Sequence, residues 1–228
     1  MHRLSFFVNK VKFIEKTGEL NLMNLYKTVE KEAISEFLEK KSKFIGYISP
    51  IESEEEAIEF INKIKSSHRD ARHNVYAYTL LKDNISRYSD DGEPHGTAGL
   101  PIMGILNKYD LKNTVIVVTR YFGGVLLGKG GLVRAYSKAA ILSTKKAKVI
   151  TMALCQKCKI SCDYNRYPKI ISSIRKNNAT VVKEEFTDKI DIEFYSQDKN
   201  LQKIRESINL ITSGTVNFDI IGKNFYKI

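Results

Sequence analysis

The stretches YSDDGEPHGTAGLP (residues 88–101) and TRYFGGVLLGKGGLVRAY (residues 119–136) decide how this chain folds. Most of its glycines fall here, and a cluster of glycines indicates positive φ angles or close approach of the backbone to another group. A strongly apolar run, residues 114–119, lies between them. We therefore predict a loop, a helix, a buried strand, a second loop and a second helix. The two loops should meet over that strand, expose amide hydrogens outward and contact whatever the protein recognises.

The residues around these loops predict further strands and helices. Ser53 and Glu56 form a capping-box sequence, and apolar residues at helical spacing follow it. Pro101 suits the first turn of a helix, where its missing N–H needs no partner. The expected strands are residues 43–48, 75–81, 85–88 and 114–119, and the expected helices run from Ser53 to about 66, from Pro101, and over 132–145.

The pattern resets at residues 146–154, which we interpret as a domain boundary. Beyond it the sequence predicts strands at 158–162, 181–186, 190–195 and 216–220, with helices opening at Pro168 and near Leu201. This βαββαβ order is the ferredoxin-like motif. The predicted fold class is therefore α+β in two domains, residues 23–148 and 149–228. Residues 1–22 are expected to be an N-terminal extension, with Met23 as the natural start.

Composition bounds the class of partner. The chain has 228 residues, a formal net charge of +11 and 43% hydrophobic residues. A basic balance favours polyanions such as RNA, unless the excess lysine only solubilises the surface. Three closely spaced cysteines do not suggest a disulfide framework, and no apolar run approaches the ~20 residues that span a bilayer. We expect a cytoplasmic protein with no membrane partner.

The first loop carries Asp90, Asp91, Glu93 and His95. These groups suit a hard cation or general acid–base chemistry, although the spacing fits no calcium loop. The alternative is structural, because Asp-Gly and Glu-Pro form turns and an acidic residue can cap the following helix. We assign no metal ligand and no cofactor.

The second loop precedes a helix, so free N–H groups there would favour an anion. Its spacing matches neither a Walker A loop nor GxGxxG. The alternative is a tight strand-to-helix connection that needs several positive φ values. The candidate residues for binding nucleic acid or an anion are Arg120, Gly123, Gly124, Lys129, Gly130, Gly131, Arg134 and Lys138.

Arg120, Tyr121 and Phe122 place a cation beside two aromatic rings. This suits stacking on bases or docking of a protein. The alternative, which we favour, pairs Arg120 with a carboxylate of the first loop as a clasp. Arg134 and Lys138 also share a helical sector with Lys145 and Lys148, which forms either a basic stripe or an ordinary solvated face.

Cys155, Cys158 and Cys162 invite a metal interpretation, but a fourth ligand is missing. Buried core cysteines are the better explanation. Cys158 and Cys162 should share one face of a strand, with Cys155 toward the other.

The motifs DDGEP (90–94), GTAG (96–99), RYFGG (120–124) and GGLVRAY (130–136) resemble those of the IMPACT family. KSKFI (41–45) and DARH (70–73) match as well, whereas His95 and Leu100 depart from the usual pattern. The resemblance implies a first domain similar to domain IV of elongation factor G, a ribosomal small-subunit protein domain and the GHMP kinases. It implies a second domain similar to the ferredoxin-like domain V of elongation factor G.

The resemblance also implies a function. Eukaryotic relatives control translation by binding a translation-associated activator protein, and bacterial members have been proposed to bind nucleic acid. No established reaction comes with the family. We therefore expect a non-enzymatic regulator of translation that binds RNA, the ribosome or a translation-associated protein, without DNA sequence specificity. The alternatives are a small-molecule enzyme or phosphate-ligand-binding protein that uses the loop before Leu132, and a docking module that uses Tyr121 and Phe122.

Overall fold

The computed structural model describes residues 24–228, so the predicted extension and Met23 lie outside the described residues. The chain divides into two compact units, residues 25–152 and 153–227. The division falls inside one continuous strand, β7 (Val149–Cys162), four residues after the predicted boundary. Because β7 continues from one unit into the next, no change in composition marks where the division between them falls.

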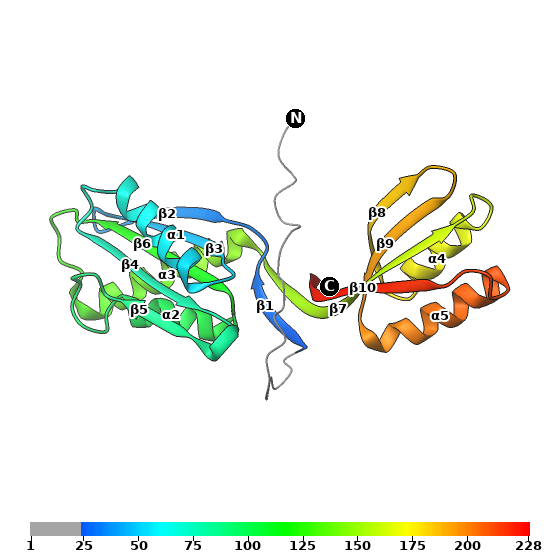
Figure 1. Cartoon of the computed structure of the whole chain (residues 1–228). Helices are drawn as coiled ribbons and strands as arrows, with labels where there is room; N and C mark the ends of the chain where they lie inside the picture. The colour runs from blue at the N-terminus through cyan, green and yellow to red at the C-terminus, as the bar shows by residue number, and fades with distance from the viewer. Residues whose placement is uncertain (1–23) are drawn as a thin grey trace. The chain divides into compact units, whose positions relative to one another are not determined.

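The first unit is built on a five-stranded sheet with the order β2-β3-β6-β4-β5 (Figure 1). Each neighbouring pair in it is antiparallel, and β6 is the central strand. Its elements are β1 (Leu25–Val29), β2 (Ala33–Glu39), β3 (Ser42–Pro50), α1 (Glu54–Ser67), β4 (His73–Thr79), the short 3₁₀ turn η1 (Lys82–Asn84), β5 (Ser86–Ser89), α2 (Gly99–Lys108), β6 (Thr114–Tyr121) and α3 (Gly128–Ala147).

Helices cover both faces of this sheet. Successive side chains of a strand point to opposite faces, so the apolar run in β6 serves two cores. Val115 and Val117 pack with the buried residues of α1, whereas Ile116 and Val118 pack with those of α2 and α3. A central strand with helices on both faces must be apolar on both sides, which confirms the buried strand predicted between the two loops.

The second unit confirms the predicted βαββαβ order. After β7 come α4 (Tyr167–Lys176), β8 (Thr180–Phe186), β9 (Ile190–Ser196), α5 (Asp198–Thr212) and β10 (Phe218–Lys227). In its sheet β9 lies between β7 and β8, and β10 also pairs with β7. One core gathers apolar residues of both helices and all four of these strands. None of the helices in residues 24–228 is long and apolar enough to cross a membrane.

The cysteines lie as predicted. All three are free and buried on β7, with Cys158 and Cys162 in the core under the helices and Cys155 in a smaller cluster with Tyr195. Burial raises the pKa of each thiol, that of Cys158 to about 11.

Three predictions of local structure need correction. Strands β1 and β2 were not predicted at all. Helix α3 begins at Gly128, four residues before the predicted start, so Gly128, Gly130 and Gly131 lie in its first turn. In the capping box, Ser53 Oγ does accept the Glu56 N–H, but the Glu56 carboxylate accepts from Glu52 N at 2.7 Å instead of from Ser53.

Candidate functional site

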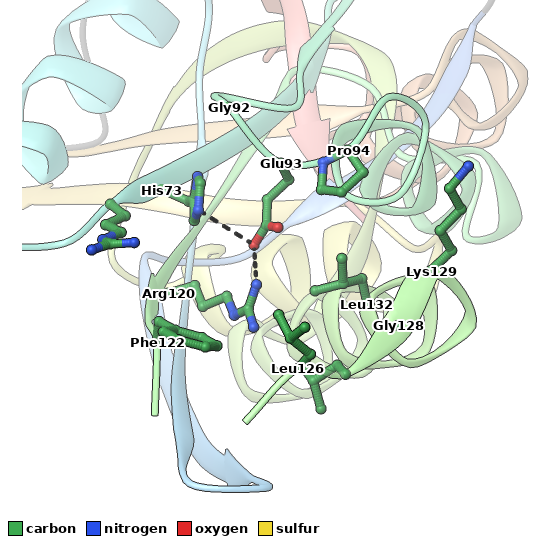
Figure 2. Close-up of a pocket in the computed structure, with 12 residues that line it drawn as sticks. His73, Gly92, Glu93, Pro94, Arg120, Phe122, Leu126, Gly128, Lys129 and Leu132 are labelled. Carbon is green, nitrogen blue, oxygen red and sulfur yellow. Dashed lines mark hydrogen bonds and ion pairs between the residues drawn. The ribbon is translucent and has the colours of Figure 1, made fainter. Parts of the chain in front are cut away.

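The two glycine-rich loops meet beside the end of β6, as predicted, and line one pocket of about 440 Å³ (Figure 2). The first loop connects β5 to α2, and the second connects β6 to α3. The pocket is lined by Arg72, His73, Gly92, Glu93, Pro94, Arg120, Phe122, Leu126, Leu127, Gly128, Lys129 and Leu132. Its size is within the range of small-molecule sites.

Asp90 organises the first loop from inside. Its carboxylate accepts the N–H groups of Gly96 (2.8 Å), Ala98 (3.1 Å) and Gly99 (2.8 Å) at the start of α2. Burial acts to raise the pKa of Asp90, but these three donors outweigh it and leave the pKa below its usual value. The prediction that this loop points free amides outward is therefore wrong, because its own carboxylate occupies them.

Asp91 fixes the loop to the sheet. Its carboxylate accepts the backbone N–H of Asn74 at 2.6 Å and pairs with Lys65 Nζ at 2.8 Å. Its carbonyl oxygen lies 2.9 Å from His73 Nδ1. A carbonyl oxygen only accepts, so His73 Nδ1 carries a proton and donates it to this oxygen.

Glu93 is the buried centre of the site. One oxygen, Oε1, accepts from Arg120 Nη1 at 2.6 Å and lies 4.0 Å from His73 Nε2 (Figure 2). The same oxygen accepts from Tyr136 OH at 2.7 Å. Burial, with the nearby Glu93 charge, raises the pKa of Tyr136, so the phenol remains a donor. Among residues 24–228, the hydrogen bonds to the Glu93 side chain are all accepted by Oε1, and the residue lines the pocket.

Arg120 provides the clasp between the loops. Only 5% of the residue is exposed, and its guanidinium lies 5.5 Å from the ring centroids of both Phe44 and Phe122. Strand register explains this environment, because Phe44 on β3 and His73 on β4 are its direct partners on either side. The predicted pairing with a loop carboxylate is therefore made by Glu93. Arg120 holds the pocket wall together and has little charge left to offer an anion.

The second loop is held against the turn between β2 and β3. Gly123 donates its N–H to Ser42 Oγ at 3.2 Å, and a Cβ at Gly123 would overlap the Lys41 carbonyl. Only glycine permits this approach. Gly124, with φ of +81°, and the helical Gly130 and Gly131 complete the connection. No side chain caps the N-terminus of α3, which begins in the pocket wall at Gly128.

The remaining predicted residues occupy different surroundings. Lys129 lines the pocket and Arg134 lies exposed one turn further along α3. Lys138 lies over the Phe37 ring at 4.3 Å. Lys148 follows the helix and pairs with Glu30, so the predicted stripe does not continue to it. The His95 side chain is 97% exposed, with Nδ1 3.8 Å from the Asp90 carboxylate.

Several residues of the site were not predicted. Tyr136, Ser42 and His73 reach Glu93 or Arg120 through strand and helix packing that the sequence does not display. The signal available for Ser42, His73 and Tyr136 was their place in the motifs at residues 41–45, 70–73 and 130–136. In residues 24–228 no cluster of His, Cys, Asp and Glu has the geometry of a metal site.

Comparisons with known proteins agree with the two-unit division. Residues 40–143 match the Impact N-terminal domain, and residues 160–215 match a domain of unknown function, DUF1949. The chain is 37% identical over 194 residues to "IMPACT family member YvyE" of Bacillus subtilis, covering 85% of this chain and 89% of that protein. It is 34% identical over 178 residues to an "IMPACT family member" of Haemophilus influenzae, covering 77% and 86%.

A solved structure also shares the fold. It is described as the crystal structure of a hypothetical protein and aligns with a TM-score of 0.56 at 23% identity, covering 88% of this chain and 99% of that one.

Proposed function

Because the chain belongs to the IMPACT family, we propose that it is a non-enzymatic, cytoplasmic regulator of translation that binds RNA, free or in the ribosome. The contact surface is the rim of the pocket between the two glycine-rich loops. The observation that supports this most is a set of exposed cations, without ion-pair partners in residues 24–228, of which Arg72 and Lys129 line the pocket.

These cations come from three separate segments. Lys40 and Lys41 lie in the β2–β3 turn that touches Gly123, Arg72 lies just before β4, and Lys129 and Arg134 lie on α3. All five are exposed, and none forms an ion pair with a carboxylate of residues 24–228. Exposed cations that no carboxylate neutralises suit contact with a phosphate backbone. The uncapped N-terminus of α3 adds N–H groups of the same polarity.

The carboxylates of the first loop support a binding role in preference to a catalytic one. The carboxylates of Asp90 and Asp91 accept backbone N–H groups that fix the loop. The Glu93 carboxylate is paired with Arg120 and accepts from Tyr136 OH. The loop thus keeps its shape while its acidic groups present little free charge to a polyanion.

The test is binding of a fluorescent single-stranded RNA, followed by anisotropy at several salt concentrations. The affinity should fall steeply with salt, and Lys129→Glu and Arg134→Glu should each weaken binding and lower the salt slope by about 1. Lys108→Glu makes the same charge change at the far end of α2 and should bind like wild type. Binding that is absent at low salt, or insensitive to salt, would rule the proposal out.

A second function is favoured by the exposed apolar tip of the second loop, where Leu126 is 82% exposed and Phe122 is 41% exposed. Such side chains suit docking of a translation-associated protein. Tyr121, which the sequence also suggested for docking, is half-buried on the opposite sheet face with its hydroxyl on His68. Partners that survive nuclease treatment and are lost with Leu126→Ser would favour docking over RNA.

A further inference from the structure

Strand β2 forms one edge of the sheet in the first unit, and half of its backbone groups point away from that sheet (Figure 1). The turn at residues 40–41 has positive φ at both positions, as a two-residue hairpin requires, and Glu39 pairs with Ser42 beside it. Bonded and non-bonded pairs alternate along an antiparallel ladder, so every second residue of β2 bonds to β3. The N–H and C=O groups that point outward, and that no element within residues 24–228 pairs with, belong to Ile34, Glu36 and Leu38.

The sequence of β2 does not protect this edge. Proteins usually protect sheet edges with proline, lysine, a bulge or a very short strand. The register of β2 with β3 is unbroken over all seven residues, and these include neither proline nor lysine. By contrast, the edge strand β5 has four residues, and β8 has a bulge between Val181 and Lys183. Strand β2 is therefore open to the addition of a further strand.

A groove of about 530 Å³ lies beside this edge. It is lined by Ile34, Ser35 and Glu36 of β2 and by Leu142 and Lys146 of α3, and we call it the β2–α3 groove. Domains that bind peptides by strand addition gain affinity from main-chain hydrogen bonds to an exposed edge and specificity from pockets for alternate side chains. The edge of β2 and the β2–α3 groove provide these two elements together.

The helix side of the groove is basic. Lys138, Leu142 and Lys146 are spaced four residues apart, so they share one face of α3. Lys138 lies over the Phe37 ring at 4.3 Å, whereas Lys146 lines the groove with Ile34, so α3 lies beside β2 in the opposite direction. Both lysines are exposed, and neither forms an ion pair with a carboxylate of residues 24–228. The groove therefore suits acidic side chains.

The spacing of the two lysines matches that of a strand. Lys138 and Lys146 are separated by about 12 Å along the helix axis. Residues four apart in a strand are separated by about 13 Å and point to the same face. Acidic residues four positions apart in an added strand would thus face both lysines, and the residue midway between them would face Leu142.

Two other occupants fit less well. A second copy of β2, paired antiparallel with Ile34 opposite Leu38, would place the two Glu36 side chains opposite each other, and like charges in that position destabilise a sheet. A nucleic acid would meet the lysines, but it has no ladder of N–H and C=O groups to pair with β2. A peptide strand uses both the backbone edge and the charges.

We propose that the β2–α3 groove binds an extended segment of a partner protein, which joins the sheet as a strand beside β2. The segment carries two acidic side chains four positions apart, which face Lys138 and Lys146, with an apolar side chain between them on Leu142. Its alternate side chains are apolar and pack beside Ile34 and Leu38, which are 47% and 70% exposed. This surface shares no lining residue with the pocket between the loops, so the proposal is independent of RNA binding.

The test is an NMR titration of the protein with the capped peptide acetyl-TEVLVET-amide, which has the length of β2. We expect saturable binding and, at saturation, slower hydrogen exchange of the amides of Ile34, Glu36 and Leu38. The amides of Ser35 and Phe37 already bond to β3 and should change little. Absence of binding, or binding that leaves the three outward amides unprotected, would overturn the proposal.

Two control peptides test the chemistry of the segment. Acetyl-TKVLVKT-amide reverses the charges, and acetyl-TVELEVT-amide keeps the composition but places the acidic residues two positions apart. Each should bind at least about fivefold more weakly than the first peptide. Equal affinity for the three peptides would contradict the assignment of Lys138 and Lys146.

Two pairs of variants test the groove itself. Glu36→Pro removes one outward N–H of β2 without touching its bonds to β3, and should weaken peptide binding at least about fivefold. Glu36→Thr loses the same carboxylate but keeps the N–H, and should bind nearly as wild type does. Lys146→Glu should also weaken binding at least about fivefold, whereas Lys145→Glu, exposed on the same helix but outside the groove, should not. Equal effects within either pair would overturn the proposal.

A uridine heptamer of RNA separates this proposal from RNA binding by the pocket rim. Whether or not the RNA binds there, it should leave hydrogen exchange in β2 unchanged and should not displace the peptide. RNA that displaces the peptide and protects the same three amides would assign the groove to nucleic acid and overturn the proposal of a peptide partner.

Discussion

At the scale of single residues, the site depends on a buried charge pair between the two loops. Arg120 and Glu93 have side chains that are 6% and 3% exposed and lie 2.6 Å apart. A buried pair gives little net stability over apolar replacements, but removing one partner leaves the other charge desolvated and unpaired. The pair therefore specifies how the loops meet more than it stabilises the fold.

Arg120→Met should lower the free energy of unfolding of the first unit by about 3–5 kcal/mol, because Glu93 then remains buried without its cation. The double variant Arg120→Met with Glu93→Gln should be less destabilised than Arg120→Met alone. Urea unfolding followed by circular dichroism measures both. Arg87→Met makes the same change at an exposed position and should stay within about 0.5 kcal/mol of wild type. Equal losses for Arg120→Met and Arg87→Met would contradict the clasp.

His68 should make stability depend on pH. It caps α1 and lies between two tyrosine hydroxyls, with Nε2 on Tyr47 and Nδ1 on Tyr121. Burial, and then the charge of Lys43, lowers its pKa below the ordinary value of 6.5. The unfolded chain therefore binds a proton more readily than the folded one as the pH falls below 6.5.

His68 thus costs no stability above pH 6.5, and its cost grows below that value until the pH passes the lowered pKa of the folded state. Melting temperatures measured from pH 8 to pH 5 should fall less in His68→Gln than in wild type. Parallel curves for the two proteins would show that His68 is not responsible.

At the scale of elements, hydrophobic periodicity predicts the helices and strands whose buried faces are apolar. It does not predict elements whose buried positions carry polar residues. Strand β6 and the two helices after the loops can be predicted, because both faces of the strand and one face of each helix are buried and apolar. Strand β2 cannot be predicted in this way, because Ser35 faces inward and Leu38 is 70% exposed. Strands usually bury their apolar residues and expose their polar ones.

The same contrast explains what was predictable in the site. A strand-end cation opposite a carboxylate-rich loop predicts a clasp, so Arg120 could be assigned from sequence. The surroundings of Arg120 could not be predicted from the sequence, since Phe44 and His73 become its neighbours only through the registers of β3 and β4 with β6. The glycines at the start of α3 suggested a loop because glycine weakens helices, yet Gly130 and Gly131 lie in its first turn.

Two glycines should respond to alanine in opposite directions. Gly123→Ala forces the second loop away from the β2–β3 turn, since its Cβ would overlap the Lys41 backbone, and should lower both stability and RNA affinity. Gly104→Ala, in the middle of α2 with nothing within 4 Å of the added methyl, should raise stability by about 0.5–1 kcal/mol. Chemical denaturation of both variants measures the effect, and a neutral Gly123→Ala would contradict the close contact.

At the scale of the whole molecule, each unit has its own core, so each can respond separately to a local change. All three cysteines belong to the core strand β7 on the side of the second unit. Their raised thiol pKa values and their burial should make the native protein slow to react with a thiol reagent.

Labelling should therefore follow the opening of the second unit. Arg120→Met should leave the labelling rate near that of wild type, whereas Ile192→Ala, which opens a cavity in the second core, should accelerate it. Mass spectrometry after timed exposure to iodoacetamide measures this. Fast labelling of the wild-type protein, or acceleration by Arg120→Met, would contradict the separation of the two cores.

The placement of the thiols on β7 has a consequence for oxidative damage. In the folded protein the three thiols are buried, so peroxide reacts with them slowly. When the second unit unfolds, all three thiols become exposed within residues 155–162. Sulfenic acid or a non-native disulfide formed there would prevent that half from closing again, while the loops around Glu93 keep their shape. Oxidation would thus inactivate the second unit and leave the pocket in the first unit intact.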